Sequence, residues 1–579
     1  MSTDEGRVKG TPNETAAAGS GWVLSWAGDG EEALLEVTAA GAAAVAVAEH
    51  APRLAADRVA SRIAAKDSTP WGAAAQAESA RRLGWTELHA TTRAILPQLD
   101  ALHAELAAEG LDRVVLAGMG GSSLAPEVIT RTAGVPLVVL DSTHPDQVRS
   151  ALAGDLARTV LVVSSKSGGT VETDSQRRAF EAAFAAAGLD AARHIVVVTD
   201  PGSPLELAAR AAGYRAVFLA DPDVGGRFSA LSAFGVVPSA LAGVDVVNLL
   251  DEAAAVADIL AEDAESNPAL VLAASIAGTS PARDKLVFLT EDSAVVGLAD
   301  WAEQLIAEST GKAGRGLLPV VTNSLRGNPP ELVEPASDVL GVRLMALVDD
   351  VEETSEGLDA VFADEITVAG SLGAQFMLWE YATAIAGRLL HINPFDQPDV
   401  ESAKVAARGL LDATPEPEPA AFVDGGVEVR GTRGLLDGVT DLNGAIDALL
   451  GRLDPARGYL AVMAYLDRES NGSLPEIRAS LAARTHRPVT FGWGPRFLHS
   501  TGQLHKGGAP IGVFLQITTA HPDDLAIPDR PFTFGTLISA QAAGDAGVLA
   551  GHHRPVLRLH LTEPSALDQV RSLLGPMPH

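Results

Sequence analysis

The chain has 579 residues, enough for three or four domains, and its 47% hydrophobic content is that of a globular protein. It contains no cysteine, which excludes disulfides, thiolate nucleophiles and cysteine-based zinc sites. The formal net charge of −31 argues against nucleic acid or an anionic membrane as a partner, because both bind basic surfaces. A site for a phosphorylated ligand must therefore create its own local positive field.

The N-terminal region, residues 1–110, is predicted to be a mainly helical segment, with apolar residues at helical spacing over 81–108. Its first 15 residues are polar and lack the apolar core of a signal peptide. The uncharged segments 37–48 and 228–244 are too short, or too rich in serine, glycine and proline, to span a bilayer. We therefore expect a cytoplasmic protein.

From residue 111 onward, short apolar strands alternate with helical stretches, which is typical of a parallel, doubly wound α/β domain. One such domain is predicted over 111–266 and a second, similar one over 267–413. A proline-rich linker over 414–422 follows. Residues 423–579 are predicted to form a separate C-terminal α+β unit, with strands at 459–466, 512–518 and 556–560.

The segment 164–173, Ser-Ser-Lys-Ser-Gly-Gly-Thr-Val-Glu-Thr, follows a predicted buried strand and precedes a predicted helix. Glycines let the backbone approach a ligand closely, hydroxyl and N–H groups donate to phosphate oxygens, and a helix N-terminus favours negative charge. The segment therefore predicts a phosphate site. Its candidate ligands are Ser165, Lys166, Ser167, Thr170 and Thr173. The alternative is an ordinary strand-to-helix turn capped by one of these threonines.

A second glycine-rich loop, 118–126, follows the strand predicted at 114–117. It lacks the third glycine of a dinucleotide fingerprint, although Asp141 lies about twenty residues on and keeps a nucleotide site possible. Two serines beside the glycines favour a hydroxyl-lined sugar or phosphate site instead, with Gly121 and Ser122 as candidates. Two such loops in one parallel sheet are more specific than either alone.

Five motifs in one order resemble the phosphoglucose isomerase family, whose two sugar-isomerase domains interconvert glucose 6-phosphate and fructose 6-phosphate. The resemblance covers roughly residues 60–412 and rests on the two loops above, on Val-Gly-Gly-Arg-Phe-Ser at 224–229 and on Ala-Glu-Ser-Thr-Gly-Lys at 307–312. The strongest match is the segment 392–404, Ile-Asn-Pro-Phe-Asp-Gln-Pro-Asp-Val-Glu-Ser-Ala-Lys. It implies a sugar-phosphate substrate, no cofactor, no metal, and a monomer or homodimer.

The resemblance also implies roles for four residues. Glu308 would be the base that moves a proton between C2 and C1 of the open-chain sugar, and Arg227 would stabilise the enediolate that forms. Lys404 would take part in opening the sugar ring, and Gln397 would orient the sugar or its phosphate. The alternatives are a solvated Glu308, an Arg227 paired with a surface aspartate, and an exposed Lys404 in a helical pair with Glu401.

One residue of the family pattern is missing, because the ring-opening histidine follows the catalytic glutamate and this chain has no histidine between His194 and His391. The segment 494–508, which concentrates His499 and His505 among glycines and basic residues, is a candidate replacement; the alternative is a solvated basic loop. We therefore expect the C-terminal unit to fold over the site and bring His499 or His505 near Lys404.

The region through 514–518 resembles the isomerase portion of fused bacterial transaldolase–phosphoglucose isomerases. A transaldolase barrel would need about 250 residues before the isomerase portion, and this chain lacks room for them. We therefore expect the isomerase portion without the transaldolase barrel.

The sequence leaves three functions open. The first is a metal-independent isomerase of glucose 6-phosphate and fructose 6-phosphate. The second is an enzyme that also accepts mannose 6-phosphate, since loss of the usual histidine geometry could relax the stereochemistry at C2. The third is a non-catalytic sugar-phosphate regulator, which would need only the phosphate site; neither a helix-turn-helix pattern nor a basic domain supports it.

Overall fold

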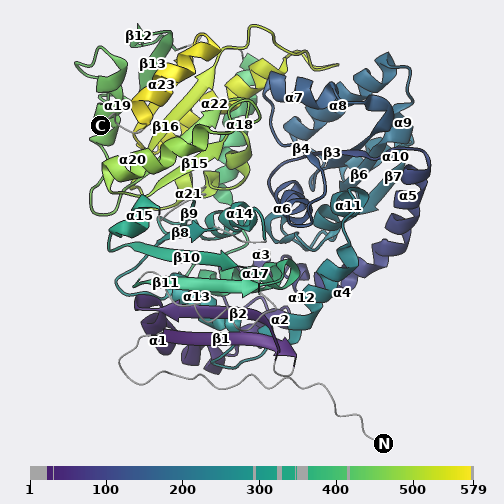
Figure 1. Cartoon of the computed structure of the whole chain (residues 1–579), viewed down its shortest axis with the longest axis vertical. Coiled ribbons are helices and arrows are strands. Elements are labelled where there is room, and N and C mark those ends of the chain that lie inside the picture. The colour runs from purple at the N-terminus through teal and green to yellow at the C-terminus, as the bar shows by residue number, and fades with distance from the viewer. Residues whose placement is uncertain are drawn as a thin grey trace, which may run out of the picture.

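The structure is a computed structural model, and it describes residues 22–29, 32–290, 295–322, 329–345, 347, 363–413 and 418–575. The described residues form three sheets, each built largely of parallel strands with helices packed against it (Figure 1). This arrangement confirms the predicted α/β class. Among the described residues, no helix combines the length and the apolar character needed to cross a membrane.

The first α/β domain has a fully parallel sheet in the order β4-β3-β5-β6-β7. Strands β5 and β6 are runs of valine, leucine and isoleucine buried on both faces, so helices must cover both sides. The strands are β3 (Arg113–Gly118), β4 (Val138–Leu140), β5 (Thr159–Ser164), β6 (Ile195–Thr199) and β7 (Ala216–Leu219). The helices are α6 (Leu124–Thr132), α7 (Pro145–Leu152), α8 (Val171–Ala186), α9 (Ala191–His194), α10 (Pro204–Ala212), α11 (Ala233–Leu241) and α12 (Val246–Leu260).

The second α/β domain has a sheet in the order β1-β2-β11-β10-β8-β9. Its four parallel strands are β8 (Lys285–Leu289), β9 (Leu318–Val321), β10 (Val339–Met345) and β11 (Glu365–Gly370). Its helices are α13 (Pro268–Ala277), α14 (Leu298–Thr310), α15 (Pro330–Val333), α17 (Leu372–Leu389) and α18 (Pro398–Ala413).

The sequence predicted a mainly helical N-terminal region, but the described part of this region begins with two strands. Strands β1 (Trp22–Asp29) and β2 (Glu32–Ala40) form an antiparallel hairpin that extends the second sheet along β11. Leu35, Val37 and Ala39 alternate inward at a period of two, a pattern that the surrounding alanine-rich sequence concealed. The helices after the hairpin are α1 (Ala42–Ala56), α2 (Val59–Ala64), α3 (Gln76–Ser79), α4 (Leu88–Thr91) and α5 (Leu96–Ala108).

The C-terminal unit is more parallel than the predicted α+β arrangement. The strand order is β12-β13-β17-β16-β14-β15; the last four of these strands run parallel, and β13 pairs antiparallel with both β12 and β17. The prediction missed the short strands β12, β13 and β15; helices α20, α21 and α22 lie between the successive parallel strands, as parallel pairing requires. The strands are β12 (Phe422–Asp424), β13 (Val427–Gly431), β14 (Tyr459–Tyr465), β15 (Val489–Trp493), β16 (Gly512–Thr519) and β17 (Val556–Leu561). The helices are α19 (Leu442–Leu450), α20 (Ile477–Thr485), α21 (Gly502–Gly507), α22 (Phe534–Gly551) and α23 (Leu567–Leu574).

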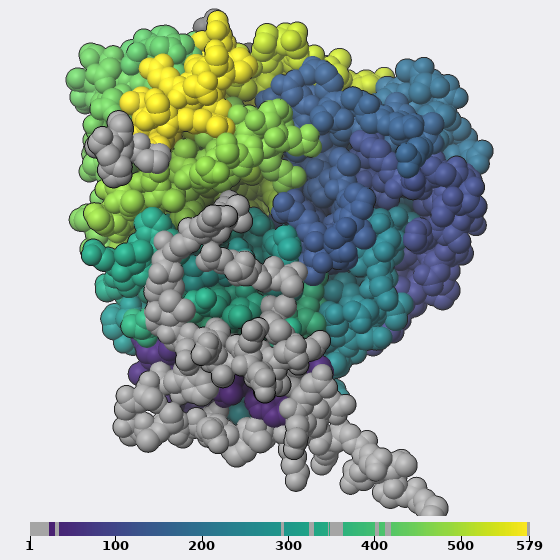
Figure 2. All heavy atoms as spheres, in the orientation of Figure 1, coloured from purple at the N-terminus to yellow at the C-terminus, as the bar shows by residue number. Residues whose placement is uncertain are grey.

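The C-terminal unit packs against both α/β domains (Figure 2). One apolar cluster joins Tyr459 and Phe514 to Val287 of the second sheet, and another joins Phe534 to Phe180 of the first domain. Buried ion pairs reinforce the contact, including Arg487 with Asp338 at 2.7 Å. Of the predicted linker, residues 414–417 lie outside the described part.

Glu380, on helix α17, is fully buried. Its carboxyl group has no hydrogen-bond partner among the described residues. Burial raises the pKa of Glu380 well above its usual value of 4.5. The folded protein therefore holds this proton after the unfolded chain has lost it, so stability falls as the pH rises from about 4.5 toward the folded pKa. The loss is about 1.4 kcal/mol for each pH unit in that window.

Glu380→Gln, which cannot ionise, is expected to escape this loss. The difference in Tm between the variant and the wild type should therefore grow from pH 5 to pH 7, measured by calorimetry. Glu262→Gln, at an exposed position, is the control and should show no such trend. A Tm difference for Glu380→Gln that stays constant with pH would contradict the prediction.

Candidate active site

Both glycine-rich loops lie at the carboxyl edge of the first sheet, as expected for ligand loops in parallel sheets. The first follows β3 and forms the short 3₁₀ turn η3 (Gly120–Ser122). A Cβ atom on Gly121 would lie 2.0 Å from the carbonyl oxygen of Gly226, so only glycine allows this contact. The loop therefore meets η5 (Gly226–Phe228), the turn that carries Arg227.

The predicted phosphate loop connects β5 to α8, and its hydroxyls partly face one another. Ser165 donates to Oγ1 of Thr170 at 3.0 Å, and the N–H of Gly169 donates to Oγ of Ser167 at 3.3 Å. The hydroxyl of Thr173 is buried and has no hydrogen-bond partner among the described residues. This leaves donors available for an anion at the N-terminus of α8, which supports the predicted phosphate site.

Lys166 does not add its ammonium group to these hydroxyls. Its Nζ lies 2.6 Å from Asp200 and 3.3 Å from the carbonyl oxygen of Pro222. Any role of Lys166 in binding phosphate would therefore fall to its backbone N–H. Ser122 is buried in the neighbouring loop, where it is 8% exposed.

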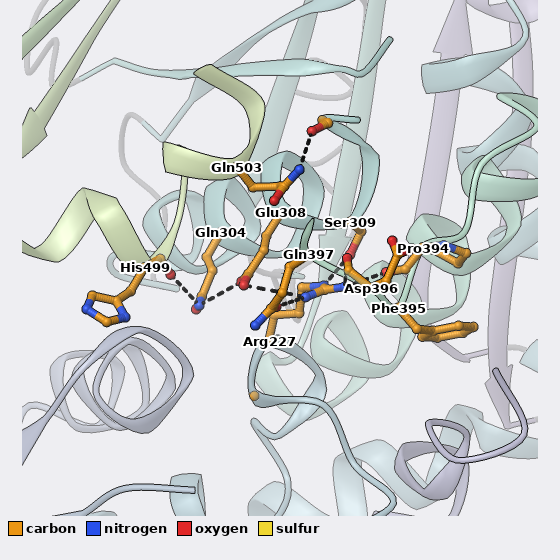
Figure 3. Close-up of polar contacts among 12 residues, drawn as sticks. Arg227, Gln304, Glu308, Ser309, Pro394, Phe395, Asp396, Gln397, His499 and Gln503 are labelled. Atoms are coloured by element: carbon orange, nitrogen blue, oxygen red, sulfur yellow. Dashed lines mark hydrogen bonds and ion pairs between the residues drawn. The ribbon is translucent and has the colours of Figure 1, made fainter. Parts of the chain in front are cut away.

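Arg227 is buried, and its guanidinium group is held by residues from two separate segments, the end of α14 and residues 394–397 (Figure 3). Nε donates to the Ser309 hydroxyl at 2.8 Å, and Nη1 donates to Oε1 of Gln397 at 2.6 Å. Nη2 donates to the carbonyl oxygen of Pro394 at 2.7 Å. Burial lowers the pKa of Arg227, and the nearby Glu308 opposes that shift. The predicted alternative, a surface arginine paired with an aspartate, is therefore wrong.

Glu308 lies near the end of α14 and is only 5% exposed. Its Oε1 is 3.5 Å from Nη1 of Arg227, and its Oε2 accepts a hydrogen bond of 3.2 Å from Nε2 of Gln304. Gln304 precedes Glu308 by one helical turn and also donates to the carbonyl oxygen of His499 at 2.7 Å (Figure 3). The solvated alternative for Glu308 is wrong, because the carboxylate faces the buried cation.

Lys312 holds the segment that carries Gln397. Its Nζ donates to the Asn393 carbonyl oxygen at 2.8 Å and pairs with the Asp396 carboxylate at 2.8 Å. Burial lowers the pKa of Lys312 to about 8, with repulsion from Arg227 adding to the shift. The backbone of 393–397 is thereby fixed against the end of α14, which places Gln397 beside Arg227.

The C-terminal unit reaches this centre through η7 (Arg496–His499) and α21. A Cβ atom on Gly311, just after α14, would lie 2.3 Å from Cα of Leu504, so a glycine is required where α21 meets the end of α14. Arg496 bridges Glu127 at 2.5 Å and Asp141 at 2.6 Å, both in the first domain. These contacts hold η7 beside the glycine-rich loop. Asp141, which the sequence analysis considered for a nucleotide site, is instead part of an ion pair.

The structure separates the two candidate histidines. Nε2 of His499 lies 3.1 Å from Oε1 of Glu172, in the first turn of α8. His505 is buried within the C-terminal unit, where Nδ1 lies 3.0 Å from the Tyr459 hydroxyl and the two rings stack at 5.7 Å. Burial lowers the pKa of His505 to about 3, with repulsion from Lys506 contributing. Of the two, only His499 contacts the phosphate-loop helix.

Lys404 lies on α18, but its side chain is outside the described residues. Helix α18 packs along α22 and against α21 and η7. The predicted approach of a histidine to the Lys404 ammonium group therefore stays a prediction. Within the described part, no group of three or more histidine or acidic residues could hold a metal ion.

The sequence prediction gave no role to several residues of the site, among them Ser309, Gln304, Glu172 and Lys312. Gln304 could have been found from its spacing, one turn before Glu308 on the same helix. Glu172 lies inside the phosphate-loop segment 164–173, but the prediction gave it no role. Lys312 appeared only as the last residue of a motif, and nothing local indicated that it would be buried.

Comparisons with known proteins identify sequence relatives of this chain. No family model matches the chain. Over 363 residues it is 30% identical to glucose-6-phosphate isomerase of Trichormus variabilis, which covers 54% of this chain and 69% of that enzyme. It is 31% identical over 344 residues to glucose-6-phosphate isomerase of Synechococcus sp. strain JA-3-3Ab, covering 51% of this chain and 65% of that enzyme.

A solved structure shares the fold. The structure of a glucose-6-phosphate isomerase from Chlamydia trachomatis superposes with a TM-score of 0.54 at 20% identity, covering 69% of this chain and 89% of that one. The sequence relatives, together with the arginine and glutamate that meet between the two α/β domains, establish the relationship. The chain belongs to the glucose-6-phosphate isomerase family.

Proposed function

We propose that this protein interconverts glucose 6-phosphate and fructose 6-phosphate through an enediolate, with Glu308 as the base. The observation that carries the proposal is the buried pair of Glu308 and Arg227, 3.5 Å apart, at the junction of the two domains. A phosphate-binding regulator would gain nothing from a buried carboxylate facing a buried guanidinium group. An aldose–ketose isomerase needs both.

Each group has a defined task. In the open-chain aldose, Glu308 takes the proton from C2 and returns it to C1, while a proton moves between the oxygens on C1 and C2. Negative charge spreads over these two oxygens in the intermediate. Arg227 is already held by Ser309, Gln397 and Pro394, so it meets that charge without reorganising.

The phosphate group would anchor the sugar at the N-terminus of α8, beside Ser165, Ser167, Thr170 and Thr173. Backbone N–H groups and hydroxyls there supply the positive field that a chain of net charge −31 otherwise lacks. His499, from the C-terminal unit, would exchange a proton with the ring form of the sugar before isomerisation. Its contact with Glu172 supports this role, because Glu172 follows the phosphate loop directly.

A coupled assay tests the proposal. Purified protein is mixed with fructose 6-phosphate, and glucose 6-phosphate is detected with its NADP-dependent dehydrogenase. We expect turnover that survives treatment with EDTA. Turnover of mannose 6-phosphate under the same conditions would extend the substrate range to the second function left open by the sequence. Binding of the sugar phosphate without turnover of either substrate would overturn the proposal in favour of a regulator.

Thr170→Val is expected to weaken phosphate binding. It removes one hydroxyl donor to a charged group, which is worth about 1.5–3 kcal/mol, so KM and the inhibition constant of 6-phosphogluconate should rise about tenfold. The value of kcat should change little, because Thr170 lies away from the reacting carbons. Inhibition constants equal to those of the wild type would place the phosphate elsewhere.

A further inference from the structure

A buried chain of hydrogen bonds leads from the first domain through the C-terminal unit to His499. The Thr143 hydroxyl lies 2.7 Å from Oε1 of Gln541, and Nε2 of Gln541 lies 2.7 Å from Oε1 of Glu172. The same carboxylate oxygen contacts Nε2 of His499 at 3.1 Å. Thr143, Gln541 and Glu172 are 0%, 4% and 6% exposed, so water competes little for these bonds.

The chemistry of these groups fixes the direction of the chain. The amide oxygen of Gln541 can only accept, so the Thr143 hydroxyl donates a hydrogen bond to it, and Nε2 of Gln541 is directed toward Glu172. The reverse orientation would set the amide oxygen against a carboxylate oxygen. Because Nε2 of Gln541 can only donate, Oε1 of Glu172 accepts that bond, and an ionised carboxylate, which has no proton of its own, also accepts from His499. The proton in the contact with His499 must then lie on Nε2 of the imidazole.

We propose that Gln541 and Thr143 are positioning residues that hold His499 as the tautomer protonated on Nε2. This inference rests on the proposed function, in which His499 opens the sugar ring. Nδ1 of His499 forms no hydrogen bond with a described residue, so it is the nitrogen left for the sugar. Two donors on one carboxylate oxygen also restrict the imidazole to a single orientation.

In the ring-opening step, a single atom, Nδ1 of His499, both accepts and returns the proton. Nδ1 accepts the proton of the C1 hydroxyl, the bond between C1 and the ring oxygen breaks as the C1 carbonyl forms, and Nδ1 returns the proton to the former ring oxygen. The proton on Nε2 stays in its bond to Glu172 throughout. No net proton enters or leaves the protein, and no oxidant or further reactant is needed.

Nitrogen NMR tests the tautomer without any dependence on activity. The protein is labelled with ¹⁵N-histidine, and the His499 signals among the 14 histidines are assigned by their loss in His499→Asn. We expect a protonated Nε2 and an unprotonated Nδ1 in the wild type. Gln541→Met and Thr143→Val, which keep size but remove the donors, should shift the signals toward a mixture of tautomers. Thr143→Ser should restore them.

Catalysed anomerisation tests the consequence. In the Glu308→Gln background isomerisation is blocked, so exchange between the α and β anomers of glucose 6-phosphate reports ring opening alone. Gln541→Met and Thr143→Val should each slow this exchange at least about tenfold, with unchanged binding of 6-phosphogluconate. Gln516→Met is the matched control, because this buried glutamine donates to the Ala542 carbonyl oxygen and to no other residue in the described part of the chain.

The outcomes separate the two proposals. A wild-type tautomer and unchanged anomerisation in both variants would overturn the positioning role and leave the isomerase function intact. An equal loss in Gln516→Met would also overturn it, because the effect would then be general loosening of the C-terminal unit. Absence of isomerase activity in the wild type would contradict the proposed function, while the tautomer measurement would still decide the role of Gln541.

Discussion

Glu308→Gln is expected to lower kcat by about 10²–10⁴, the scale of lost general-base catalysis. The amide keeps the shape of the side chain but cannot accept the C2 proton. Glu308 is itself buried beside the guanidinium group of Arg227, so water has little access to this position. The measurement is steady-state turnover of fructose 6-phosphate, together with exchange of the C2 proton into deuterated solvent.

Glu303→Gln is the matched control on the same helix. Burial raises the pKa of Glu303 to about 8, with the nearby Asp300 adding to the shift, so this side chain is already mostly uncharged at neutral pH. Its replacement by the neutral amide should leave kcat near the wild-type value. If Glu308→Gln kept most of its turnover, Glu308 would not be the base.

His499→Gln is expected to reduce ring opening by about 10² or more, the lower range for an acid–base group. The side chain that bonds to Glu172 is lost, and the closed sugar must then open through water or Lys404. The effect should appear in anomer exchange and in kcat with the ring-closed substrate pool. The C2 proton exchange of the small open-chain fraction should change far less.

His505→Gln supplies the comparison. His505 lies in the core of the C-terminal unit against Tyr459, so its replacement should lower Tm but leave the kcat of the folded protein unchanged. Ring opening that depended on His505 and not on His499 would reverse the assignment. Normal anomer exchange in both variants would leave ring opening to Lys404 and water.

Much of the centre could be predicted from short segments. Glycines and hydroxyls between a buried strand and a helix predict an anion site wherever they occur, and the structure places that loop at the carboxyl edge of the first sheet. The family motifs named Glu308 and Arg227 before their contact was known. Gln304 follows from helical spacing alone. Each of these inferences depends on interactions within a few turns of the chain.

The sequence by itself indicated the α/β class and the two loops, because local patterns encode them, and the resemblance to a known family indicated the carboxylate and guanidinium groups of the centre. Only the tertiary structure decided that β1 and β2 extend the second sheet, that His499 rather than His505 reaches Glu172, and that Gln541 shares this carboxylate. Glu172 and Gln541 are 369 residues apart in sequence, and their contact depends on how three packed units meet. Such a contact is set by the burial of apolar faces between units, which no local pattern records.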